Sequence, residues 1–167
     1  MPTEVRIDRS AGGLALELAR ELAYPVDRVW DALTVPAQLS VWFPCDVELE
    51  QMAGGRIAFA FPDDDEPEVA ELLEFAEVGE PRVIAYIWSD EHLRWTLESG
   101  AAAADGISTL RLRDEIADPK TVAQIAAGWD ACLDDLAALL DGREDAGTRI
   151  PGDGDVARFR ALLGLEG

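Results

Sequence analysis

The chain has 167 residues, of which 49% are hydrophobic, and 34 Asp and Glu against 14 Lys and Arg give it a formal net charge of −20. This length allows one well-buried core, and so acidic a surface disfavours nucleic acid and anionic membrane faces, which bind proteins through Lys and Arg. Because no stretch approaches the ~20 apolar residues of a membrane span and the N-terminus lacks the apolar core of a signal peptide, we expect a cytoplasmic protein.

After a polar lead over residues 1–13, the first element that we expect is a strand over residues 14–24. In this segment, LALELARELAY, leucines recur at every second position from Leu14 to Leu18, which is typical of a half-buried strand. The Ala, Leu and Glu content also suits a helix. We favour the strand because Pro25 ends the segment and a clear helical pattern follows it.

The stretch VWDALTVPAQLSVWF, residues 29–43, belongs to two short helices that meet at a proline. Pro25 suits the first turn of the first helix, and Pro36 suits the first turn of the second. Apolar residues recur with helical spacing in the first helix, and Trp42 lies near the end of the second. The sequence therefore predicts a helical corner that carries several large apolar side chains.

Six strands are expected next, because alternating segments are separated by turn signals rich in Gly, Pro and Asp. In HLRWTLES, for example, Leu93, Trp95 and Leu97 alternate with polar residues, as in a sheet that is covered on one face only. The acidic run at residues 63–66 lacks the spacing of a calcium loop and predicts a hairpin tip. The six segments are residues 45–50, 54–62, 68–78, 81–88, 92–99 and 107–116.

The longest helical pattern begins at Asp118, which can cap the helix, and ends at Gly142. At 1.5 Å per residue this helix should be roughly 33 Å long, which is enough to cross the sheet. After a linker, residues 155–164 predict a short amphipathic helix with an apolar stripe that includes Phe159. This stripe can dock on its own domain, cap a cavity or bind another chain, and the sequence leaves these alternatives open.

The order of these elements predicts an α+β protein with a helix-grip fold. We expect a curved antiparallel sheet of about seven strands around one long C-terminal helix, with the two short helices between strands 1 and 2. The expected organisation is an N-terminal lead over residues 1–13, one domain over 14–142, and a linker with a short helix over 143–167. Because the sheet need not touch the helix along its whole length, an apolar cavity can remain between them, and the aromatic residues near Pro36 would close its mouth.

Several blocks of the sequence resemble the helix-grip START-like (SRPBCC) superfamily: YPVDRVWDALTVPAQLSVWF, GGRIAFAF, LLEF, RVIAYIW, LRWTL and AAGWDACLDDLAALL. That superfamily includes START domains, polyketide cyclases and the birch-pollen allergen, and the blocks are similar above all to its branch of heat-shock-protein ATPase activator homologues (AHSA-type). The resemblance covers about residues 14–142. It implies the fold and leaves the function open, because members include lipid binders, cyclases, hydrolase-like proteins and co-chaperones.

The side chains that we expect to line the cavity and bind a ligand are mostly aromatic, and the same residues suit a plain core equally well. Glu71 would point into the cavity if the bulkier face of its strand turns inward, and it would need a partner there. His92, the single histidine, would lie at the rim, either as a polar contact or as an exposed turn residue. The candidate residues are Trp42, Phe43, Phe59, Phe61, Glu71, Phe75, Tyr86, Trp88, His92, Trp95, Trp129 and Leu133.

The sequence offers no convergent catalytic set, no metal site and no motif for a cofactor. One histidine excludes a multi-histidine zinc site within one chain, and Cys45 and Cys132 are too few for a disulfide framework. We therefore expect a protein that binds a small hydrophobic or aromatic molecule rather than an enzyme. Two alternatives remain, a co-chaperone-like regulator of a heat-shock ATPase and a cyclase-like or hydrolase-like enzyme that uses Glu71 or His92. A homodimer also stays open.

Overall fold

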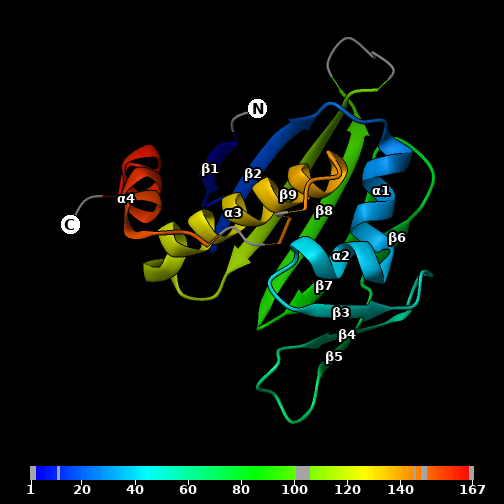
Figure 1. Cartoon of the computed structure of the whole chain (residues 1–167). Helices are drawn as coiled ribbons and strands as arrows, with labels where there is room; N and C mark the ends of the chain where they lie inside the picture. The colour runs from blue at the N-terminus through cyan, green and yellow to red at the C-terminus, as the bar shows by residue number, and fades with distance from the viewer. Residues whose placement is uncertain (1–2, 11, 101–105, 145, 148–149, 166–167) are drawn as a thin grey trace.

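The computed structural model describes residues 3–10, 12–100, 106–144, 146–147 and 150–165. Its main feature is a six-stranded antiparallel sheet with a long helix, α3 (Val122–Leu140), lying across one face (Figure 1). This arrangement confirms the prediction of an α+β helix-grip fold. In spatial order the strands of the sheet are β1 (Glu4–Asp8), β2 (Leu14–Leu22), β9 (Ser108–Ile116), β8 (Glu91–Ser99), β7 (Arg82–Trp88) and β6 (Glu74–Ala76).

The edge strand β1 is an element that the sequence analysis did not predict. Residues 4–8 were expected in the polar lead, but they pair with β2 from Glu4 opposite Ala19 to Asp8 opposite Ala15. The alternation in this segment is short and has only Val5 and Ile7 as apolar residues, so the pattern alone does not separate a strand from a loop. The prediction that residues 4–8 belong to a polar lead is therefore wrong, because they form an edge strand that extends the sheet.

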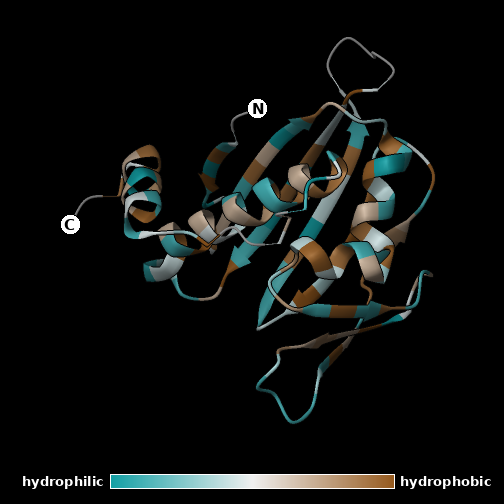
Figure 2. Cartoon of the chain, viewed as in Figure 1, coloured by the Kyte–Doolittle hydropathy of each residue, from teal (hydrophilic) through white to brown (hydrophobic). Residues whose placement is uncertain are grey.

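A second, three-stranded sheet adjoins the first, and the segment 68–78, predicted as one strand, is divided between the two. The backbone N–H of Leu72 donates to the carbonyl of Gly55 at 2.8 Å, whereas the next N–H, that of Leu73, donates to Ala85 of β7 at 2.8 Å. The described chain therefore has nine strands rather than about seven. The loop between β4 and β5 is hydrophilic, as expected of a hairpin tip (Figure 2). The strands of the small sheet are β3 (Asp46–Leu49), β4 (Arg56–Ala60) and β5 (Glu68–Glu71).

The predicted helical corner is formed by α1 (Val26–Thr34) and α2 (Pro36–Trp42). Val35 joins them, since its N–H donates to the carbonyl of Asp31 at 2.8 Å and its own carbonyl accepts from Leu39 at 2.8 Å. The indole of Trp42 donates to the carbonyl of Ala32 at 2.8 Å, which fixes the angle between the helices. This corner directs the end of α2 toward α3.

The long helix begins as the sequence predicts. Asp118 accepts a hydrogen bond from the N–H of Lys120 and starts a short 3-10 turn, η2 (Pro119–Thr121), which leads directly into α3. The apolar side chains of α3, among them Trp129, Leu133 and Leu136, are buried in the core. Within the described residues, no helix has the length and apolar character that crossing a membrane requires.

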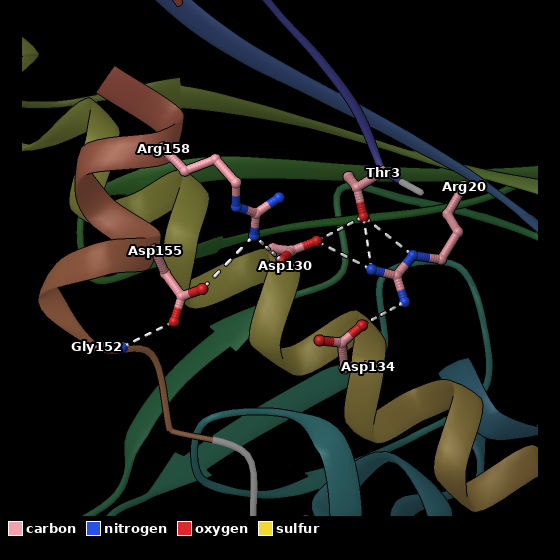
Figure 3. Close-up of polar contacts among 7 residues, drawn as sticks. All are labelled: Thr3, Arg20, Asp130, Asp134, Gly152, Asp155 and Arg158. Atoms are coloured by element: carbon pink, nitrogen blue, oxygen red, sulfur yellow. Dashed lines mark hydrogen bonds and ion pairs between the residues drawn. The ribbon is translucent and has the colours of Figure 1, made fainter. Parts of the chain in front are cut away.

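The tail helix α4 (Asp153–Leu162) docks on α3 of its own chain, which is the first of the alternatives that the sequence left open. Phe159 is fully buried in the core. Beside it, Asp130 of α3 accepts from Arg20 of β2 at 3.0 Å and from Arg158 of α4 at 3.1 Å, and Thr3 donates to the same carboxylate at 2.7 Å (Figure 3). One buried acid therefore joins α3, α4, β2 and the N-terminal segment.

Candidate ligand-binding cavity

A cavity of about 390 Å³ opens where the C-terminal end of α2, the β7–β8 hairpin and the middle of α3 meet. Phe43 ends α2 by adopting an extended conformation, which brings the chain across toward α3. The volume falls in the range of small-molecule sites. The lining residues are Val41, Trp42, Phe43, Pro44, Trp88, Glu91, Ile125, Gly128, Trp129, Ala131, Cys132, Asp135, Gly147 and Pro151.

Four of the predicted site residues, Trp42, Phe43, Trp88 and Trp129, form an aromatic wall of this cavity. The ring centroid of Phe43 lies 5.1 Å from that of Trp88 and 5.6 Å from that of Trp129. These spacings are typical of favourable aromatic contacts. The indole of Trp129 also donates to Asp114 at 2.9 Å, and that of Trp42 is tied to α1. The wall therefore has a fixed shape before any ligand arrives.

Four other predicted lining residues belong to the core and do not line the cavity: Phe59, Tyr86, Trp95 and Leu133. The indole of Trp95 donates to the hydroxyl of Tyr86 at 2.9 Å, and burial raises the pKa of that hydroxyl well above its usual range. The Trp95 ring contacts both Trp42 and Trp129, with centroids 5.3 and 5.5 Å away. These rings fill the space between the sheet and α3, so the cavity lies at the edge of the predicted chamber.

The two polar candidates, Glu71 and His92, are not in the cavity. Glu71 is exposed at the end of β5, opposite Arg56, and the prediction that it points inward is wrong, because its strand belongs to the small sheet. His92 lies at the surface with a third of its side chain exposed, and its Nδ1 contacts the carboxylate of Glu115. An enzyme that uses either residue as a base in the cavity has no support in this geometry.

The last two candidates lie outside the cavity as well. Phe61 is 39% exposed and stacks on the outer side of Trp88, with ring centroids 6.4 Å apart. Phe75 is half-buried on β6 and contacts Trp30 of α1, with centroids 5.7 Å apart. The alternation of polar and apolar residues showed that both side chains could be buried, but it could not show against which elements.

The buried acid Asp114 is the functional candidate that sequence reasoning missed. It is fully buried on the core face of β9, and its Oδ2 accepts the indole hydrogen bond of Trp129. Burial is the main cause that raises the pKa of Asp114 to about 8; the Trp129 hydrogen bond opposes this shift, and the interaction with the neighbouring Glu91 carboxyl adds to it. The sequence does contain a signal for its burial. Leu112 and Ile116, two positions to either side, are apolar and share one face of the strand with Asp114.

Glu91 connects Asp114 to the cavity. It opens β8 opposite Trp88, lines the cavity, and accepts a hydrogen bond from the N–H of Ala117 at 3.2 Å. Oδ1 of Asp114 is buried and has no hydrogen-bond partner in the described part of the chain, and the Glu91 carboxyl is among the groups that raise the pKa of Asp114. Together with burial, this neighbouring acid favours the protonated form of Asp114. This pair places an ionisable group beside an apolar cavity.

The thiol of Cys132 is a poor candidate for a reactive group in the cavity. Cys132 lines the cavity, and burial raises the pKa of its thiol to about 12, so the nucleophilic thiolate is scarce at neutral pH. Among the described residues, no group of three or more His, Cys, Asp or Glu side chains is placed to hold a metal ion. The arrangement can hold a molecule by shape and apolar contact, with Glu91 as a polar contact.

Three solved structures share the fold of this chain at low sequence identity. A conserved protein of unknown function from Enterococcus faecalis aligns with a TM-score of 0.75 and 19% identity, over 100% of this chain and 94% of its own. CalU16 from Micromonospora echinospora aligns with a TM-score of 0.66 and 18% identity, over 96% of this chain and 94% of its own. DynU16, a protein in the dynemicin biosynthetic locus, aligns with a TM-score of 0.59 and 24% identity, over 81% of this chain and 49% of its own. At these identities the likeness shows the fold alone.

The family of the chain follows from its sequence. No curated protein matches it. Residues 23–141, which run from the start of α1 to the end of α3 and hold most of the cavity, match the family described as Activator of Hsp90 ATPase homolog 1-like protein. This match confirms the resemblance found in the sequence blocks, and the chain belongs to the family of Activator of Hsp90 ATPase homolog 1-like proteins.

Proposed function

We propose that the protein binds a small hydrophobic or aromatic molecule in the cavity between α2, α3 and the β7–β8 hairpin. The observation that carries the proposal is the cavity of about 390 Å³ with four aromatic side chains in its wall. Small-molecule sites are concave, mostly apolar and largely formed before binding. The apolar contact area would supply most of the binding free energy, because each buried Å² contributes about 25 cal/mol.

The rigidity of the wall supports the same proposal. Ordering mobile side chains on binding costs about 0.5–1.5 kcal/mol for each side chain. Trp42 and Trp129 are already held by their indole hydrogen bonds, and Phe43 packs against both of the neighbouring indoles, Trp88 and Trp129. Little of this cost remains for a ligand that fits between them.

Gly128 allows the proposal to be tested by filling the cavity. A Cβ atom added to Gly128 would meet no other atom within 4 Å, so a larger side chain can enter the cavity from α3. We expect wild-type protein to bind naphthylmethanol, a neutral bicyclic probe, in isothermal titration calorimetry. Gly128→Leu should weaken that binding at least about tenfold.

The matched control is Gln124→Leu, which adds the same side chain at an exposed position one turn earlier on α3. This variant should bind the probe like wild type, and circular dichroism should show that both variants are folded. The proposal is wrong if wild-type protein shows no saturable binding, or if Gly128→Leu binds as tightly as Gln124→Leu.

A second candidate, regulation of a heat-shock ATPase, rests on the family match over residues 23–141. The net charge of −20 is suited to docking on a basic surface of such a partner. The test measures the ATPase rate of a purified heat-shock ATPase with and without the protein. A rate change that high salt removes would support this candidate, and an unchanged rate would rule it out.

A further inference from the structure

The polar character of the cavity identifies the kind of molecule that suits it. Among the described lining residues, the charged side chains are Glu91 and Asp135, and both are acidic. Asp135 is buried and takes part in interactions of its own, so the argument rests on Glu91. An anionic ligand would meet a like charge here, in a chain whose net charge is −20.

The second observation is the fully buried Asp114 behind Glu91. Its Oδ2 accepts the indole hydrogen bond of Trp129, while Oδ1 has no hydrogen-bond partner among the described residues. Glu115, on the same strand, adds negative charge nearby. A cation near two neighbouring carboxyl groups would favour their ionised forms. Among the described lining residues, no positively charged side chain accompanies these acids.

We propose that the natural ligand is an apolar molecule that carries a protonated amine, with the ammonium group against Glu91 and the apolar body against the aromatic wall. This inference rests on the proposed function, since it concerns the same cavity. Trp88 ends β7 and Glu91 begins β8, and the two residues pair across the hairpin beside its turn, so one ammonium group can reach both. Cations are attracted to indole faces as well as to carboxylates, and both interactions strengthen away from water.

Three probes that share one ring system test the charge preference. Naphthylmethylamine is cationic at neutral pH, naphthylmethanol is neutral, and naphthoate is anionic. We expect the amine to bind at least about tenfold more tightly than the alcohol in titration calorimetry, and the carboxylate to bind most weakly. If the alcohol binds as well as the amine, or the carboxylate binds best, the inference about the amine is overturned while the proposed function stands. If none of the three binds, the proposed function itself fails.

Variants of two glutamates on β8 assign the preference to one side chain. Glu91→Gln should bring the ratio of the affinity for the amine to the affinity for the alcohol down to about one, because it removes the charge but keeps the shape of the side chain. Glu98→Gln makes the same change near the other end of the strand, outside the cavity, and should keep the preference of wild type. An equal loss in the two variants would show that net charge alone attracts the amine, and would overturn the role of Glu91.

Discussion

Asp114 is a carboxyl group on a strand face where the residues two positions away on both sides are apolar and buried. A buried acid of this kind is costly unless it is neutral or paired. Here the Trp129 indole donates a hydrogen bond to one carboxyl oxygen, and burial together with the neighbouring Glu91 raises the pKa of Asp114 to about 8, which favours its neutral form at neutral pH. The cost is tolerated at a position that both holds a cavity wall in place and keeps a proton next to the cavity.

We expect Asp114→Asn to stabilise the protein by an amount that grows as the pH rises from about 4 to about 8. The pKa of Asp114 is raised from 3.8 to about 8 in the folded protein, so folded wild type keeps a proton that the unfolded chain releases in this interval. Wild type therefore loses stability as the pH rises, whereas the neutral amide, which can still accept from Trp129, does not.

Thermal unfolding across this pH interval measures the effect as the difference in Tm between the variant and wild type. Asp63→Asn, at the exposed tip between β4 and β5, is the control and should show no such trend. A difference in Tm that is the same at every pH for Asp114→Asn would contradict the buried, protonated state of this residue.

At the scale of elements, the attachment of α4 depends on the acid–base cluster around Asp130. Both carboxylate oxygens of Asp130 are used, one by Thr3 and Arg20 and the other by Arg158. Arg20 also reaches Asp134 of α3 at 3.0 Å. The side chains of Arg20 and Asp130 are 5% and 8% exposed, so this pair is shielded from water and salt. The segment that leads into α4 contributes Gly147 and Pro151 to the cavity lining, which links the tail to the site.

We expect Arg20→Ala to reduce the free energy of unfolding by about 3 kcal/mol, because removal of one partner leaves a buried charge without its main counterion. Arg94→Ala removes a pair with Glu74 in which both side chains are roughly half exposed, and should cost at most about 1 kcal/mol. Urea denaturation of the two variants makes the comparison. Equal losses would mean that the Arg20–Asp130 pair is not shielded as described.

At the scale of the whole molecule, the features that sequence could predict are those that depend on a period within one segment. The alternation in β8 and the apolar stripe of α3 each fix one element, and the order of elements is enough for the fold. The features it could not predict depend on how one segment pairs with another. β1 is too short for its own alternation to identify it as a strand, and the division of residues 68–78 depends on pairing with Gly55 on one side and Ala85 on the other.

The candidate site shows the same limit. The sequence predicted that aromatic residues meet near α3, and four of them do line the cavity. It could not predict which rings fill the interior, because that depends on how side chains such as Trp95 and Tyr86 pack together in space. The role of Asp114 was missed for a related reason. A single acid within an apolar alternation does not show which groups surround it, and the neighbours Glu91 and Trp129 lie on other elements.

The central claim is that the cavity beside Trp88 and Trp129 binds an apolar molecule, and the indole N–H signals of the five tryptophans test it most directly by NMR. Naphthylmethanol is titrated into protein labelled with isotopic tryptophan, and the signals are assigned with single Trp→Phe variants. The account predicts saturable shifts of the Trp88 and Trp129 signals, while Trp30, which packs on Phe75 outside the cavity, stays unchanged. Absence of a saturable shift at Trp88 and Trp129, or a larger shift at Trp30, would contradict it.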